Sequence, residues 1–292
     1  MNLSHYYIGI AMLTAGALSA CGNILEEPSM AKATTGELSI ELTTDATLEI
    51  NTKATETESV KNILDNQGTF SISMTPQTGT TVPTGTILPT KEGTHKGIPV
   101  GSYNIKAFNN RTMTKDFEWN NPVLESTVET VTVKPGSQNK TLTCTLQNSI
   151  IAVDAAAWST LLNEVDVSAF QVVNMANVPV KGTTITGGTS LLASGSKTTL
   201  NTSTLYAKPD LRDVKIVLDG QLKSGTQQKF RASAPIRPSD TNNVIGAKNK
   251  YNVSFSLDNT KGQLVLSITV DNTVTPVPIV IPILIEENSS AS

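Results

Sequence analysis

Short segments with an apolar residue at every second position recur along this sequence, and they constrain its fold more than any other feature. Such alternation places the apolar side chains on one face of a β-strand. The clearest early example begins at Gly36, and its apolar positions are Leu38, Ile40, Leu42, Leu48 and Ile50. Gly, Pro and Asn residues separate the segments, which favours an all-β sandwich or barrel over alternating strands and helices.

Similar segments continue through the rest of the chain. We expect strands at 70–74, 98–108, 128–133, 141–146, 170–173, 205–207, 214–218 and 230–234, and a hairpin formed by 251–257 and 264–270. In the segment 98–108, we expect Val100, Tyr103 and Ile105 to point inward around an irregularity at Pro99 and Gly101.

One segment has the periodicity of a helix. Trp158, Leu162 and Val165 fall near one helical face, and Asp154 stands where it can cap the first turn. We therefore expect one short helix in the second half of the chain.

The last apolar segment, 276–285, is unusual because no polar residue interrupts it. Its alternate positions are Val277, Ile279, Ile281, Ile283 and Ile285. The residues between them are apolar too, which favours burial on both faces, yet Pro278 and Pro282 cannot donate to a ladder and suit an edge. Two interpretations stay open: an extended segment that lies in a groove, or an ordinary last strand of a second sandwich.

An apolar run near the N-terminus, Ile8–Ala20, is too short to span a bilayer and is typical of a secretory signal peptide, here 1–20. The residues Leu18 to Cys21 resemble the bacterial lipoprotein box, in which Cys21 receives a diacylglyceryl thioether and becomes the acylated N-terminus. Each buried methylene contributes roughly 0.8 kcal/mol, so the acyl chains give stable anchoring to an outer membrane. We expect residues 21–35 to form a tether. The alternative is an ordinary secreted protein with a chance cysteine.

The composition excludes several classes of function. The 292-residue chain has a net charge of −3 and 16% charged residues, so it lacks the basic surface that nucleic acids require. Apart from Cys21 there is only Cys144, which cannot form an internal disulfide and which alternation places on an apolar face. His95 lies in a Gly- and Lys-rich stretch that predicts an exposed turn. We expect no enzymatic activity, no metal site and no cofactor.

Several segments together resemble the fimbrillin-type subunits of the type V pili of Bacteroidales. These are the lipoprotein box, 36–42 followed by Thr52, Lys53 and Ala54, and then 70–72, 98–107 and 143–148. The resemblance implies an all-β fold of two transthyretin-like β-sandwich domains, at 36–148 and 149–275, with the helical segment in the second. Residues 276–292 would be a donor-strand-like segment and tail.

The resemblance also implies a way of assembly. Such subunits reach the outer-membrane surface as lipoproteins, and a trypsin-like protease removes the lipidated N-terminus with its first strand. Here the removed strand would carry Leu38 to Ile50, and the cut would fall between Lys53 and Ala54. These two residues lie in a polar stretch, 51–58, which we expect to be an exposed loop. A strand from another subunit, here Val277–Ile285, would then fill the emptied groove.

The partners implied are other pilus subunits, and a host glycan or protein as the target of adhesion. Of the roles of stem, tip and anchor, we expect that of a stem subunit, since the chain has both an apparent donor segment and a cut site.

A second class of function also stays open: a surface glycan-binding lipoprotein of a polysaccharide-uptake system. Sugar platforms need exposed aromatic faces. Aromatic residues make up only 4% of the chain and most of them alternate inward, which leaves Trp119 as the main candidate for a sugar contact.

Overall fold

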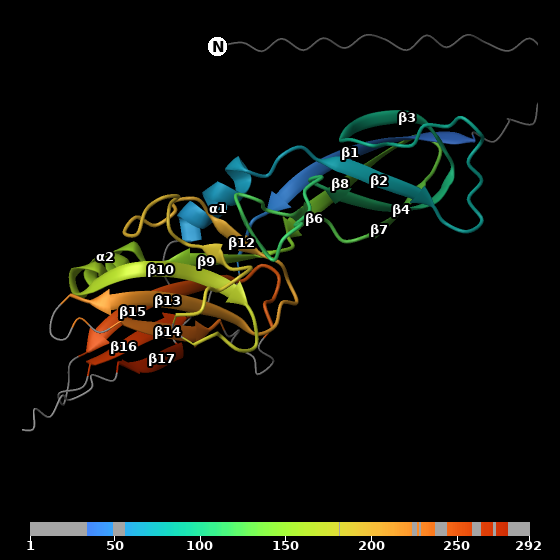
Figure 1. The fold of residues 1–292 in the computed structure, drawn as a ribbon. Coiled ribbons are helices and arrows are strands. Elements are labelled where there is room, and N and C mark those ends of the chain that lie inside the picture. Colours follow the sequence, from blue (N-terminus) through green and yellow to red (C-terminus); the bar gives the residue numbers. More distant parts are fainter. Residues whose placement is uncertain are drawn as a thin grey trace, which may run out of the picture. The chain divides into compact units, whose positions relative to one another are not determined.

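The computed structural model describes residues 34–48, 56–180, 182–223, 227, 229–236, 244–258, 264–270 and 273–279. Strands dominate these residues and form three sheets, so the predicted all-β fold is confirmed. Figure 1 shows the strands of these sheets. Buried side chains form two hydrophobic cores, one mainly from the first half of the chain, up to residue 148, and one mainly from the second half.

The first half contributes one sheet with the strand order β2-β4-β6-β8-β1-β3, in which β7 pairs with β4. Buried side chains of β1 and β8 pack with those of β2, β4 and β7 in the first core. The elements are β1 (Thr35–Asp45), α1 (Glu56–Asp65), β2 (Ser71–Pro76), β3 (Gly93–Pro99), β4 (Gly101–Phe108), β6 (Leu124–Glu125), β7 (Glu129–Val133) and β8 (Ser137–Leu146).

The second half contains two sheets that share the second core, with the orders β11-β10-β13-β14 and β17-β16-β15-β9-β12-β5. The strand β5 (Phe117–Trp119) comes from earlier in the chain. The other elements are β9 (Ser149–Val153), α2 (Ala155–Glu164), β10 (Val165–Asn174), β11 (Thr189–Ser190), β12 (Leu205–Ala207), β13 (Val214–Leu222), β14 (Lys229–Pro235), β15 (Lys250–Asp258), β16 (Leu264–Val270) and β17 (Thr273–Ile279).

Two local predictions for the second half are confirmed, the helix capped by Asp154 and the hairpin, but Val165, predicted on the helical face, lies at the start of β10 because its backbone is extended. Asp154 caps the N-terminus of α2: its Oδ1 accepts hydrogen bonds from the N–H groups of Ala156 and Ala157 at 2.9 and 3.1 Å. N–H groups in the first turn of a helix have no partner within the helix, so this cap supplies one. The helix packs through Trp158, whose ring stacks on Phe170 with the centroids 4.8 Å apart. The strands β15 and β16 pair antiparallel, as the predicted hairpin requires.

The two halves place their first strands in the same way. β1 pairs antiparallel with β3 and parallel with β8, whereas β9 pairs antiparallel with β12 and parallel with β15. Each first strand is therefore held along both of its edges, by one strand of each direction.

Three predictions for the first half are wrong. Residues 56–58 begin α1 and do not belong to a loop, because the apolar side chain of Ile63 in this helix is buried in the first core. Val100 is 38% exposed where the chain passes from β3 to β4, although Tyr103 and Ile105 are buried as predicted. His95 lies in the strand β3 rather than in a turn, because the backbone there pairs with β1.

The predicted burial of Cys144 in the core is confirmed. Its side chain is fully buried on β8, and this burial raises the pKa of the thiol to about 11. The buried thiol is therefore protonated at neutral pH and poorly reactive.

Candidate functional site

The candidate site is the seat of β1, which we define as the space between β3 and β8 that β1 fills (Figure 1). Leu38 stands opposite His95 of β3 and Gln138 of β8. The parallel ladder to β8 runs from Glu37 to Asp45, so nearly the whole strand contributes main-chain hydrogen bonds to the seat.

The inward side chains of β1 fill the first core. Leu38 is fully buried and Ile40 is 2% exposed, whereas Leu42 is half-buried. Beyond the end of the strand, Ala46 and Leu48 are also buried in this core. Because burying a Leu or Ile side chain contributes about 1.5–3 kcal/mol, the apolar positions predicted from alternation are the main anchors of β1.

The outward side chains of β1 add weaker contacts. Glu37 accepts a hydrogen bond from Ser137 Oγ at 3.1 Å, and Lys96 Nζ lies 3.5 Å from its carboxylate. The hydroxyl groups of Thr43 and Thr143 lie 3.0 Å apart. Exposed contacts of this kind contribute at most about 1 kcal/mol each, so the core and the ladder dominate the binding of β1.

The start of β1 approaches the chain before β8 very closely. A Cβ atom added to Gly36 would lie 2.1 Å from the backbone oxygen of Lys134, so only glycine fits there without a backbone shift. Glycine at this position lets the first residues of β1 reach the register that places Leu38 in the core.

The segment after β1 carries the predicted cut. Lys53, Ala54 and the predicted strand residue Ile50 lie outside the described residues, as does Cys21. Residues on either side of the segment are held in the same core, Leu48 before it and Ile63 of α1 after it.

The predicted donor residues lie only partly within the described chain. Val277 and Ile279 belong to β17, which pairs antiparallel with β16 and places them opposite Leu266 and Leu264. Ile281, Ile283 and Ile285 lie outside the described residues. The structure does not bring β17 and the seat of β1 together, since the two strands belong to different sheets.

The prolines of β17 share one edge of the strand. Pro276 and Pro278 are two residues apart, and the N–H positions of alternate residues point to the same edge. β17 ends the strand order of its sheet, so one of its edges has no partner in that sheet, and prolines suit an edge of this kind.

The family of the chain follows from a comparison with family models. A model described as a domain of unknown function, DUF4493, matches residues 34–283. The chain belongs to the DUF4493 family. No curated protein matches it in sequence.

Solved structures similar to this DUF4493 protein include a fimbrial assembly protein from Parabacteroides distasonis ATCC 8503. It is 10% identical with a TM-score of 0.39, and the match covers 84% of this chain and 99% of that chain. The fimbrial anchor protein Mfa2 from Porphyromonas gingivalis is 10% identical with a TM-score of 0.28, over 82% and 98% of the two chains. Both are Bacteroidales fimbrial proteins, the group that the sequence resembles.

The proposed sugar contact, Trp119, lies in β5 of the DUF4493 protein. It pairs with Leu205 of β12, and its half-buried ring packs against the second core.

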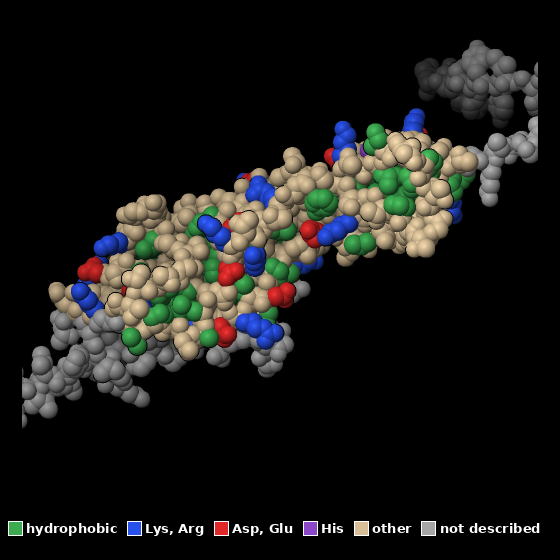
Figure 2. All heavy atoms as spheres, turned by 45° about the vertical axis from the view of Figure 1, so that its right-hand side comes forward, with side chains coloured by type: hydrophobic (Ala, Val, Ile, Leu, Met, Phe, Trp, Pro, Cys, Tyr) green, Lys and Arg blue, Asp and Glu red, His purple; other side chains and the backbone are tan. Residues whose placement is uncertain are grey.

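Neither a metal centre nor a membrane helix stands out in the described part of the DUF4493 protein. No group of three or more His, Cys, Asp or Glu side chains there could hold a metal ion. Within the same residues, no helix is long and apolar enough to cross a membrane. On the face that Figure 2 shows, Lys and Arg side chains are scattered among acidic ones rather than gathered in one patch.

Proposed function

We propose that this DUF4493 protein is a structural subunit of a cell-surface fimbria and polymerises by strand exchange. The observation that carries the proposal is the seat of β1, where an N-terminal strand is paired along both edges and buries Leu38 and Ile40 in the core. The strand continues to the rest of the chain only through residues 46–55. A cut in that segment turns β1 into a separate strand, held by non-covalent contacts alone.

The segment Val277–Ile285 is the proposed donor for another subunit. Its apolar residues repeat every second position, as Leu38, Ile40 and Leu42 do in β1, so they can occupy the same pockets. In strand addition the main-chain ladder supplies affinity and the alternate side chains supply register. Because the prolines of the donor share one edge, its ladder would be complete toward one neighbour and partial toward the other.

Trypsin treatment of the purified chain tests the proposal. We expect cleavage between Lys53 and Ala54, shown by intact mass, followed by ladders of oligomers that resist SDS. The variant Lys53→Ala should stay monomeric, and so should a chain without residues 276–292. Lys91→Ala serves as the matched control, because Lys91 is an exposed lysine outside the proposed cut, and it should form ladders like the native chain. Clean cleavage at Lys53 without oligomers would contradict the proposal.

The proposal includes export as a lipoprotein that is anchored through Cys21 until the cut releases the subunit. The Cys21→Ala variant should lose incorporation of radiolabelled palmitate and leave the outer-membrane fraction. Cys144→Ala is the control, because its buried thiol is inaccessible to acylation and the variant should still take up the label. Label that persists in Cys21→Ala would rule out this anchor.

A further inference from the structure

The seat of β1 has three inner positions that the proposed donor has to fill. Leu38 and Ile40 are buried there, and Leu42 is half-buried. The donor, Val277–Ile285, has apolar residues at every second position, so its pattern alone allows more than one register. The prolines of the donor and the end of the seat decide between these registers.

The N–H groups of β1 that face β8 set the first restriction. The N–H group of Glu37 donates to the backbone oxygen of Gly136 at 2.9 Å. Alternate N–H groups of a strand point to the same edge, so those of Ser39, Glu41 and Thr43 also face β8, with which β1 pairs along this stretch. A donor that runs in the direction of β1 keeps these bonds only where it has no proline.

The prolines of the donor disfavour the registers that begin early in the segment. With Val277 in the place of Leu38, prolines stand at positions 37, 39 and 43 of β1. With Ile279 in that place, prolines stand at positions 37 and 41. Both registers lose the bond to Gly136 and at least one further bond to β8.

A register that begins at Ile281 satisfies both the inner positions and the ladder. One proline then faces β8, Pro282, and Val280 supplies the N–H group that Glu37 supplies in β1. A later start, at Ile283, leaves only two apolar residues for the three inner positions.

The end of the seat at Gly36 agrees with this register. An added Cβ there would overlap the backbone oxygen of Lys134, and residues 273–292 contain no glycine, so a donor has to leave the seat before this position. In the register that begins at Ile281, the residue due there is Ile279, which β17 instead holds in its ladder with β16. The donor therefore enters the seat directly after β17.

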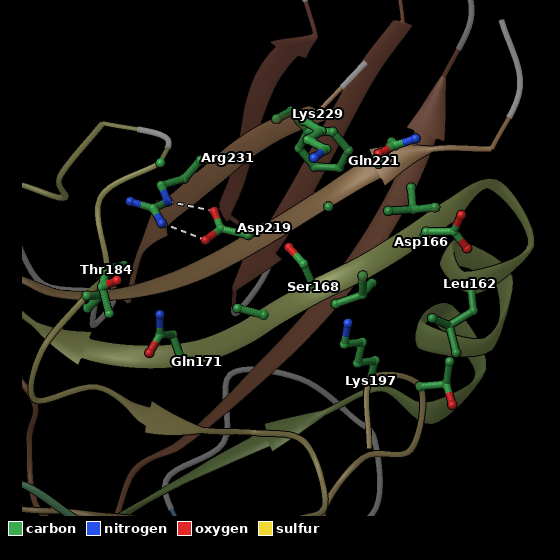
Figure 3. Close-up of a pocket in the computed structure, with 18 of the residues that line it drawn as sticks. Leu162, Asp166, Ser168, Gln171, Thr184, Lys197, Asp219, Gln221, Lys229 and Arg231 are labelled. Carbon is green, nitrogen blue, oxygen red and sulfur yellow. Dashed lines mark hydrogen bonds and ion pairs between the residues drawn. The ribbon is translucent and has the colours of Figure 1, made fainter. Parts of the chain in front are cut away.

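A cavity beside β10, β13 and β14 offers no comparable ladder to the donor (Figure 3). Ser168 of β10, Asp219 of β13 and Arg231 of β14 are among the side chains that line it. β10 and β13 each pair with another strand on both edges. A segment that lay over them would contact side chains alone, so the seat of β1 is the better acceptor of a strand.

We propose, on the basis of the proposed strand exchange, that the donor of one copy enters the seat of another copy at the single register in which Ile281 replaces Leu38. Ile283 and Ile285 then take the next two inner positions. β17 stays in its own sheet, so each subunit keeps this strand while it donates the residues that follow.

Disulfide cross-linking between subunits tests this register. Glu41 stands opposite Thr141 of β8, both are exposed, and the register puts Leu284 in the place of Glu41. In a Cys21→Ala chain cut by trypsin, the pair Leu284→Cys/Thr141→Cys should link neighbouring subunits in most oligomers after mild oxidation. Non-reducing gels and peptide mapping measure the link. Cys144 is fully buried and does not compete.

Three control pairs report registers that are shifted by two or four residues. Each combines Thr141→Cys with one other substitution: Val280→Cys, Pro282→Cys or Glu286→Cys. A shift of two residues moves a Cα atom by roughly 6.6 Å along the strand, so these pairs should link at least about tenfold less. Before oxidation, all four pairs should form ladders like the Cys21→Ala chain, which shows that the substitutions disturb neither folding nor exchange.

The outcomes separate the register from the strand exchange on which it rests. Ladders in which a control pair links as well as the Leu284→Cys pair, or in which no pair links, would overturn the register and leave the strand exchange standing. A native chain that is cut at Lys53 and forms no ladders would overturn the strand exchange, and the register with it.

Discussion

Glu118 shows how one carboxylate organises the turn before β5. Its Oε1 accepts hydrogen bonds from the N–H groups of Thr114 and Lys115 at 2.6 and 2.7 Å, and its Oε2 accepts one from Asn121 Nδ2 at 2.6 Å. Burial raises the pKa of Glu118, but these hydrogen bonds outweigh it and lower the pKa below the ordinary value of 4.5. The ionised carboxylate therefore stabilises the fold above that value, and this contribution is lost as the pH falls through the lowered pKa.

We predict that Glu118→Gln lowers the urea midpoint at pH 7 and that its difference from the native chain shrinks as the pH is lowered toward 3. Denaturation curves at several pH values measure this directly. Glu92→Gln is the matched control, because the carboxylate of Glu92 is exposed. A difference between Glu118→Gln and the native chain that stays constant across this pH range would contradict the assigned role.

At the scale of elements, alternation predicts the strands that bury one face and misses those that do not. β1, β4 and β8 combine clear alternation with buried side chains. Most residues of β3 before its last two are exposed, so its sequence has no apolar alternation that would predict a strand. The strand forms because its backbone pairs with β1. The helix α1 has few apolar residues, and a polar stretch hides its start. The apolar residues of β1 could be predicted from the sequence. Its partner strands, β3 and β8, could not, because strand pairing depends on residues far apart in the sequence.

The element β17 also carries a prediction. An edge strand with unpaired donors is a template for another chain, and proline removes such donors. We expect Pro278→Val to give β17 an additional donor on its open edge and to produce oligomers without proteolysis, which size-exclusion chromatography would detect. Pro83→Val, in an exposed loop, should remain monomeric. If Pro278→Val is monomeric at high concentration, the proline does not protect this edge.

At the scale of the whole molecule, the two halves exchange parts of their cores. Phe117, of β5, comes from within the first half of the sequence, yet it is buried in the second core. Conversely, Tyr206 of β12 is fully buried in the first core, with its hydroxyl 3.5 Å from Asn62 Oδ1 of α1. Asn120 adds a hydrogen bond to Ser203 Oγ at 3.0 Å. Because each core contains a side chain that the other half of the sequence supplies, we expect the halves to unfold together.

The prediction is that one urea transition covers both cores. In a Cys21→Ala chain, Cys144 is the only thiol, so its reactivity reports the first core, while fluorescence of Trp158 and Trp119 reports the second. The two curves should coincide. Phe117→Ala should lower the free energy of unfolding obtained from both curves by about 3–5 kcal/mol, the usual cost of truncating a buried phenylalanine. Ile87→Ala, at a side chain that is 89% exposed, should change neither value. A variant Phe117→Ala that moves the fluorescence curve alone would show that the second half unfolds independently, since Phe117 would then support only the core in which it lies.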